Sequence, residues 1–181
     1  LYRVYAISHI FMKTEKKEFI INADKHAYAF VEKKDNKTTL KIYQPFSKYK
    51  WMNNHNSSIW QGWQQMRTFD DLLIITKSLK DVMSIVENTC YSSVSLQQEG
   101  ASAKPHIMDD LKVRFNHIVV LYDNDFDKRI NWGKNLGKTF ARDNNIIFIM
   151  IPSKYKSKDF SDLIKNHGIR KSKEILNQII K

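Results

Sequence analysis

The stretch His117–Asp125 reads His-Ile-Val-Val-Leu-Tyr-Asp-Asn-Asp, a short apolar run that ends in two aspartates. An apolar run without polar alternation is typical of a strand that is buried on both faces. In an extended chain, Asp123 and Asp125 point to the same side of such a strand. A carboxylate pair suits Mg²⁺, which prefers oxygen ligands. The alternative is that Asp125 or Asp127 caps a helix beginning near Phe126.

Similar apolar runs lie on both sides of this stretch and predict further strands. They are Leu72–Ile75, Ser92–Leu96 and Ile146–Met150. Segments that suit helices lie between the runs, at residues 78–88, 105–114 and 126–143. This alternation predicts an α/β fold, a parallel sheet flanked by helices, whose ligand sites lie at the carboxyl ends of its strands. The tail Ile169–Lys181 predicts a basic amphipathic helix that either covers the core or leads into a following domain.

Acidic residues follow two of the other predicted strands. Asp81 comes shortly after the first strand, and Asp159 comes after the last. Each has an alternative interpretation, because Ser78 with Asp81 resembles a capping box, Lys77 and Asp81 have the spacing of a helical ion pair, and Asp159 has the position of an N-cap. Capping alone does not predict that all the acidic sites follow strands at one edge of a sheet. We therefore expect them to converge.

The first seventy residues or so have a different pattern, typical of a small, mostly antiparallel β-rich subdomain. Its strand-like runs are Glu18–Ile21, Ala27–Val31 and Thr39–Tyr43. The polar segment Lys33–Lys37 predicts a hairpin turn. Because Trp51–Ser58 is polar and rich in turn formers, we expect a boundary at or after it and divide the chain into residues 1–70 and 71–181.

The composition indicates an anionic partner. The 181 residues carry a formal net charge of +11 and 12% aromatic side chains, as expected of a folded basic protein that binds nucleic acid. The alternative is a general enrichment of surface lysine and asparagine. The single cysteine, Cys90, excludes an internal disulfide framework or a multi-cysteine zinc module and fits a reducing cytoplasmic setting. No run is long enough for a membrane span, and the start at Leu1 suggests a fragment of a longer polypeptide.

Four ordered segments resemble the Toprim domain, a metal-binding fold of DnaG-type primases, topoisomerases, RecR proteins and some nucleases. They are Ile74–Asp81, Ser93–Leu96 continuing through Glu99 to Ala101, Val120–Asp125 and Lys158–Asp162. The resemblance covers residues 72–168 and implies a catalytic site at Asp81, Asp123, Asp125 and Lys77. It also implies a Mg²⁺ or Mn²⁺ ion held by Asp123, Asp125 and Asp159.

The β-rich segment before the Toprim-like region resembles that of DnaG-type primases and phage primase-helicases. The resemblance implies a primase core, a nucleotidyltransferase that makes short RNA primers from NTPs on a single-stranded DNA template. It also implies zinc-binding and helicase domains outside this chain, and a bacterial or virus-infected cell, with a phage gene as one origin. The expected nucleic-acid or nucleotide contacts are Lys41, Lys48, Lys50, Trp51, Arg114 and Arg129, with Trp60 either a second stacking residue or part of the core.

Two departures from the family pattern leave other functions open. Lys77 stands where the first Toprim motif has a glutamate, and Lys128 stands where many primases have glycine. A protonated lysine cannot bind Mg²⁺, so Lys77 could contact phosphate, pair with Asp81 or mark a site without catalysis. The alternatives to a primase are therefore a non-catalytic Toprim module that binds nucleic acid within a larger replication protein, and a Toprim nuclease.

Overall fold

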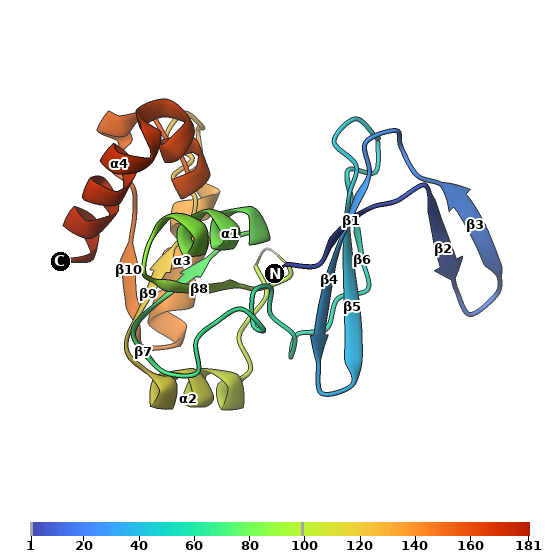
Figure 1. The fold of residues 1–181 in the computed structure, drawn as a ribbon, viewed down its shortest axis with the longest axis horizontal. Coiled ribbons are helices and arrows are strands. Elements are labelled where there is room, and N and C mark those ends of the chain that lie inside the picture. The colour runs from blue at the N-terminus through green and yellow to red at the C-terminus, as the bar shows by residue number, and fades with distance from the viewer. Residues whose placement is uncertain (1, 99) are drawn as a thin grey trace.

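The computed structural model describes residues 2–98 and 100–181, and Figure 1 shows that strands of the two halves form separate sheets. In the N-terminal half, a four-stranded antiparallel sheet has the order β1 (Val4–Ala6), β4 (Tyr28–Lys34), β5 (Lys37–Tyr43), β6 (Trp51–Asn53). The strands β2 (His9–Lys13) and β3 (Glu18–Asn22) form a separate hairpin beyond this sheet (Figure 1). The antiparallel β-rich half that the sequence predicted is therefore confirmed.

The turn between β4 and β5 lies inside the segment predicted to be a hairpin connection. Asp35 and Asn36 have φ angles of 50° and 61°. Both residue types tolerate the left-handed region, and two consecutive positive φ angles match the twist of a tight hairpin. The turn fixes the register in which Phe30 lies opposite Lys41.

Residues 51–53 differ from the prediction, which placed them in a polar, turn-rich segment. They form β6, which pairs with β5 so that Trp51 lies opposite Tyr43. The two rings stack with centroids 4.4 Å apart. This cross-strand partner lies eight residues away in the sequence, so local composition could not show it. The strands β1 and β2 were not predicted either.

In the C-terminal half, a four-stranded parallel sheet has the order β10-β9-β7-β8. The strands are β7 (Asp70–Thr76), β8 (Ser92–Ser95), β9 (Phe115–Leu121) and β10 (Ile147–Ile149). The helices are α1 (Leu79–Asn88), α2 (Pro105–Arg114), α3 (Trp132–Asp143) and α4 (Phe160–Ile180), with a single 3₁₀ turn, η1, at Ser153–Tyr155. The predicted parallel sheet with flanking helices is confirmed.

Both faces of this sheet are buried, as the uninterrupted apolar runs predicted. Leu73, Ile75 and Val120 join a core that includes residues of α2 and α3. Ile74 and Val119, one residue out of phase, join a second core with α1 and α4. The alternation follows from the two-residue period of strands. Because β7 and β9 pair in parallel, with Thr76 opposite Leu121, their carboxyl ends lie side by side.

The helix α3 begins at Trp132, six residues later than the predicted start at Phe126. Asn131, rather than Asp125 or Asp127, is its N-cap, and the Asn131 side chain accepts a hydrogen bond from the Lys134 N–H. The intervening residues form a loop, which is held in part by the Asn131 amide donating to Asn124. The predicted boundary was wrong because several residues here suit a cap equally well.

The helix α4 is longer than the predicted tail helix and covers the sheet. It runs from Phe160 to Ile180 with a non-helical residue at Gly168 (φ 75°, ψ 163°), so its last part coincides with the predicted segment. Ile175 and Leu176 are fully buried in the core shared with α1. In the part of the chain that the structure describes, no helix combines the length and apolar character needed to cross a membrane.

Candidate metal centre and nucleic-acid groove

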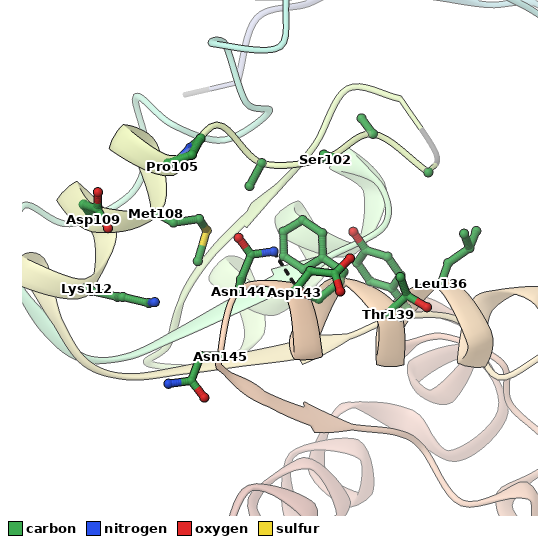
Figure 2. Close-up of a pocket in the computed structure, with 15 residues that line it drawn as sticks. Ser102, Pro105, Met108, Asp109, Lys112, Leu136, Thr139, Asp143, Asn144 and Asn145 are labelled. Atoms are coloured by element: carbon green, nitrogen blue, oxygen red, sulfur yellow. Dashed lines mark hydrogen bonds between the residues drawn. The ribbon is translucent and has the colours of Figure 1, made fainter.

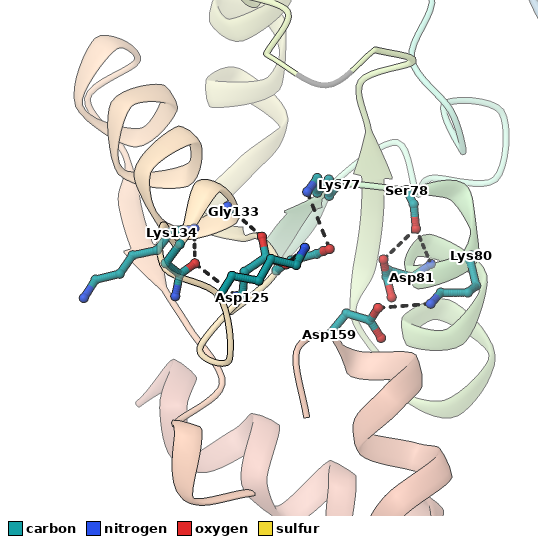
Figure 3. Close-up of polar contacts among 11 residues, drawn as sticks. Lys77, Ser78, Lys80, Asp81, Asp125, Gly133, Lys134 and Asp159 are labelled. Carbon is teal, nitrogen blue, oxygen red and sulfur yellow. Dashed lines mark hydrogen bonds and ion pairs between the residues drawn. The ribbon is translucent and has the colours of Figure 1, made fainter. Parts of the chain in front are cut away.

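Three aspartates from distant parts of the chain meet at the carboxyl edge of the parallel sheet. Asp81, Asp123 and Asp159 each have a carboxylate oxygen within 4.8 Å of the others. Asp123 lies two residues beyond the end of β9. Asp81 comes from the first turn of α1 and Asp159 is the N-cap of α4 (Figure 3). The convergence expected from the sequence is thus present for these three residues, and we call them the acid cluster.

The capping interpretations hold together with the clustering. The Ser78 hydroxyl caps α1 by accepting from the Asp81 N–H, and it donates to the Asp81 carboxylate at 2.6 Å. Asp159 caps α4 by accepting from the Asp162 N–H at 2.7 Å. The Ser161 hydroxyl in the first turn of α4 donates to Asp81 at 3.1 Å. The caps therefore fix the positions from which two of the carboxylates reach the cluster.

Two lysines face the cluster. The Lys77 ammonium lies 3.5 Å from Asp123, and the Lys80 ammonium lies 3.0 Å from Asp159. Both ion pairs neutralise carboxylates that burial would otherwise leave uncompensated. The predicted helical pair placed Lys77 beside Asp81, and the structure shows it in an ion pair with Asp123 instead.

Burial and mutual repulsion disturb the ionisation of the cluster. Burial, followed by the charge of Asp159, raises the pKa of Asp81 to about 6 against the opposing effects of Ser78 and Lys80. Burial also raises the pKa of Asp123, whereas the Lys77 charge lowers it. Carboxylates crowded together in this way favour either protonation or a bound cation.

Asp125 lies outside the cluster, although the sequence suggested it as a ligand. One of its oxygens accepts from the Lys128 ammonium at 2.7 Å, and the other accepts from the Gly133 N–H at 3.2 Å. Burial raises the pKa of Asp125, but these hydrogen bonds together with the charges of Lys128 and Lys77 lower it on balance. Its carboxylate joins the loop to the start of α3, so the D-x-D spacing alone did not determine where each oxygen points.

A groove of about 460 Å³ joins the acid cluster to the N-terminal sheet. One wall carries the cluster with Lys77, Lys80 and Lys158, and the other carries side chains of β4, β5 and β6. The lining residues of this second wall are Phe30, Lys41, Tyr43, Lys50 and Trp51. Carboxylates on one side thus face cations and aromatic rings on the other.

The aromatic wall has the character of a stacking surface. Trp51 is 49% exposed and stacks on Tyr43. The Lys41 ammonium lies 4.9 Å from the centre of the Trp51 ring, and Lys50 lies 5.7 Å from that of Tyr43. Exposed rings flanked by cations are suited to unpaired bases and their phosphates.

The groove contains some of the predicted nucleic-acid contacts and not others. Lys41, Lys50 and Trp51 line it, whereas Lys48, Arg114 and Arg129 are not among its lining residues. Arg114 donates to the carbonyls of Thr68 and Arg67 at 2.7 and 2.8 Å. Trp60 is 1% exposed and belongs to the core. Glu99, part of one Toprim-like segment, lies outside the described residues.

Sequence reasoning did not single out Phe30, Tyr43, Gln61 and Lys158, which also line the groove. The period of two offered a signal for Tyr43, because it lies on the same face of β5 as Lys41. Phe30 is the cross-strand neighbour of Lys41. Gln61 comes from the connection between the halves, where its backbone pairs with Ser95 at the end of β8. No short-range pattern could have placed it there.

A second hollow of about 340 Å³ lies beside α2 and α3 (Figure 2). Met108 and Phe140 contribute apolar surface to it, and Asp109, Lys112 and Asn144 are among its polar residues. None of the 15 described residues that line it is a predicted site residue. The groove at the acid cluster, and not this hollow, contains the candidate chemistry.

The donor set of the acid cluster fits a hard divalent cation. Three carboxylates supply only oxygen ligands, and their oxygens are close enough to share one ion. The neighbouring groove is open to water and substrate, which Mg²⁺ normally keeps among its ligands. Asp81, Asp123 and Asp159 are therefore the residues that would hold the ion.

The sequence matches no protein-family model and no curated protein. Solved structures resemble it more clearly. A DNA primase domain from Pseudomonas aeruginosa has a TM-score of 0.68 at 12% identity over 93% of this chain. The DnaG primase catalytic domain bound to single-stranded DNA gives 0.66 at 13% over 93%, and the primase fragment of the bacteriophage T7 primase-helicase gives 0.58 at 14% over 90%.

This chain spans 56%, 57% and 66% of the lengths of those three structures. The similarity includes both the antiparallel sheet and the parallel sheet, since it extends over nine tenths of the chain or more. The resemblance to Toprim domains is thereby confirmed at the level of the fold. The chain therefore has the fold of DNA primase catalytic domains, with a Toprim-type sheet in its C-terminal half.

Proposed function

We propose that this chain is the catalytic core of a DNA primase that joins ribonucleotides on a single-stranded DNA template. The observation that carries the proposal is the groove in which the acid cluster faces Lys41, Lys50 and Trp51. The similar DnaG domain is bound to single-stranded DNA, and the T7 fragment comes from a primase-helicase, which supports a DNA template and a linked helicase as partners. A zinc-binding domain outside this chain is proposed on the sequence resemblance alone.

In this proposal the two walls have different tasks. Trp51 and Tyr43 stack template or nucleotide bases, and Lys41 and Lys50 contact the phosphates beside them. Asp81, Asp123 and Asp159 would hold Mg²⁺ or Mn²⁺, which supplies activation of the 3′-hydroxyl and stabilisation of the leaving pyrophosphate. Asp125 orders the loop between β9 and α3 through Gly133 and Lys128. Lys48, Arg114 and Arg129 remain candidates for contacts outside the groove.

The test is template-directed synthesis of oligoribonucleotides with Mg²⁺ or Mn²⁺. We expect synthesis by the unaltered chain, none by Asp123→Ala and normal synthesis by the matched control Asp127→Ala, which removes an exposed acid from the same loop. Retained binding of single-stranded DNA by Asp123→Ala would show that the loss is catalytic. Failure of the unaltered chain to synthesise on any template would count against the proposal.

The alternative of a non-catalytic module has one specific observation in its favour, the ion pair between Lys77 and Asp123. An ammonium beside this carboxylate occupies space that a metal ion bound to Asp123 would need. The same assay separates the alternatives, since a binding module retains DNA affinity without synthesis in every variant. A Toprim nuclease would instead degrade single strands in a manner that depends on Asp123.

A further inference from the structure

Lys77 occupies a different kind of position from Lys80, the other lysine that forms an ion pair with the acid cluster. Its side chain is 16% exposed, and its ammonium lies 3.5 Å from Asp123, itself only 17% exposed. The Lys80 side chain, paired with Asp159, is 56% exposed. Lys80 can therefore turn towards solvent at little cost, whereas Lys77 is held inside the site. Figure 3 shows Lys80 beside Asp81 and Asp159, whereas Lys77 lies apart from these two aspartates.

The charge of Lys77 reaches both aspartates of the D-x-D segment. It lowers the pKa of Asp123 against the effect of burial, and it contributes to the lowered pKa of Asp125, where burial is again the largest and opposing effect. Lys128 lies 2.7 Å from the Asp125 carboxylate. Two carboxylates at the end of β9 are thus matched by two ammonium groups from this chain.

This arrangement limits how many divalent ions the site can hold. An ion held by Asp81, Asp123 and Asp159 would displace the exposed Lys80 ammonium from Asp159 more easily than it would displace the buried Lys77 ammonium from Asp123. A second ion that also used the Asp123 carboxylate would come close to the Lys77 ammonium, which lies 3.5 Å from Asp123 Oδ2. The buried Lys77 ammonium would then repel it at close range in a poorly solvated site.

Resting on the metal centre proposed above, we propose that Lys77 is a resident cation of the site and restricts the acid cluster to one divalent ion. The side chain takes the place of a second ion beside Asp123, so it compensates the charge of this carboxylate in every state of the protein. Removing the ammonium opens a second position for a divalent ion.

The experiment counts Mn²⁺ ions bound to the whole chain, by measuring free Mn²⁺ with electron paramagnetic resonance during a titration at fixed ionic strength. We expect one ion per chain for the unaltered protein and two for Lys77→Gln and Lys77→Glu. The matched control Lys80→Gln removes the same charge from the same cluster, and we expect it to hold one ion with a lower dissociation constant.

Two ions in the unaltered protein, or one ion in every Lys77 variant, would overturn the inference while leaving the metal centre in place. No Mn²⁺ bound to the unaltered protein or to any variant would overturn both. Lys77→Gln, which keeps the length of a polar side chain, decides the matter if Lys77→Glu does not fold. Thermal unfolding of each variant shows whether it is folded, and only folded variants enter the comparison of bound ions.

Discussion

The Cα of Gly133, at the start of α3, packs directly against the backbone of Asp123. A Cβ added at Gly133 would overlap the Asp123 carbonyl and lie 2.9 Å from the Asp123 Cβ. The neighbouring Gly133 N–H binds Asp125. The position of Asp123 thus depends on the absence of a side chain at Gly133, ten residues later.

Gly133→Ala should displace Asp123 and lower both stability and metal binding. Overpacking against backbone typically costs about 1–3 kcal/mol, even though alanine favours a helix more than glycine does. Urea unfolding measures the stability, and Mn²⁺ titration measures the ion affinity. The control Asn135→Ala changes an exposed residue of the same helix and should alter neither. Unchanged affinity in Gly133→Ala would show that the loop adapts without moving the carboxylate.

The sequence predicted the layout of the parallel sheet because its signals are local. The apolar runs at β7 and β9 predict both the strands and their burial. Asp123 and Asp159 follow strands that the α/β alternation predicts to be parallel. The direction of each carboxylate is a tertiary property. Asp125 turns to Gly133 and Lys128, and Lys77 turns to Asp123, because of contacts that the D-x-D spacing does not contain.

The N-terminal half was predicted less completely, for a related reason. Strands with exposed faces have weak patterns, and β1 and β2 have several exposed residues each. Contacts depend on partners that are distant in the sequence, as when the Glu32 carboxylate accepts from the Gly62 N–H at 3.1 Å and joins β4 to the connection between the halves. Composition predicted a basic surface, but only the register shows that Phe30, Lys41 and Trp51 share a wall of the groove.

Without divalent metal, the chain should lose stability as the pH rises from about 4 to 6. Burial and then the charge of Asp159 raise the pKa of Asp81 in the folded state from its ordinary value of 3.8 to about 6, so the folded state binds the proton more tightly than the unfolded state. The folded state gives up that advantage as pH rises through this window. At about 1.4 kcal/mol per unit, the loss is at most about 3 kcal/mol.

Asp81→Asn should remove this dependence and be more stable than the unaltered chain at pH 7 in EDTA, as measured by urea unfolding at a series of pH values. Burial raises the pKa of Glu32 to about 7, against the Gly62 hydrogen bond, so a second loss with the same sign should continue to higher pH. Glu32→Gln should remove this second loss of stability and leave the loss due to Asp81 unchanged. Identical profiles for Asp81→Asn and the unaltered chain would show that Asp81 ionises normally.

Trp51→Ala should weaken binding of single-stranded DNA by about 1–3 kcal/mol, the usual contribution of one stacked base. The side chain is half exposed in the groove and stacks on Tyr43 of the neighbouring strand β5. Fluorescence anisotropy of a labelled oligonucleotide measures the affinity. The control Trp132→Ala removes an exposed tryptophan from α3, outside the groove lining, and should leave affinity unchanged. Equal losses in both variants would argue against a stacking wall at β5 and β6.

Arg114→Ala should affect stability more than nucleic-acid binding, in contrast to Lys50→Ala. The guanidinium of Arg114 donates to two main-chain carbonyls, those of Thr68 and Arg67, and lies 5.4 Å from the centre of the Trp63 ring. Its loss should lower the free energy of unfolding by about 1–3 kcal/mol, since the carbonyls lose a charged donor.

Lys50 is exposed at the groove, so its removal should leave stability unchanged and make DNA affinity less sensitive to salt. One phosphate contact changes the slope of log affinity against log salt by about 1. Measuring anisotropy at several salt concentrations, with urea unfolding of the same variants, separates the two roles. A reduced salt slope for Arg114→Ala with full stability would place the phosphate path across α2 and β9, away from the groove that faces the acid cluster.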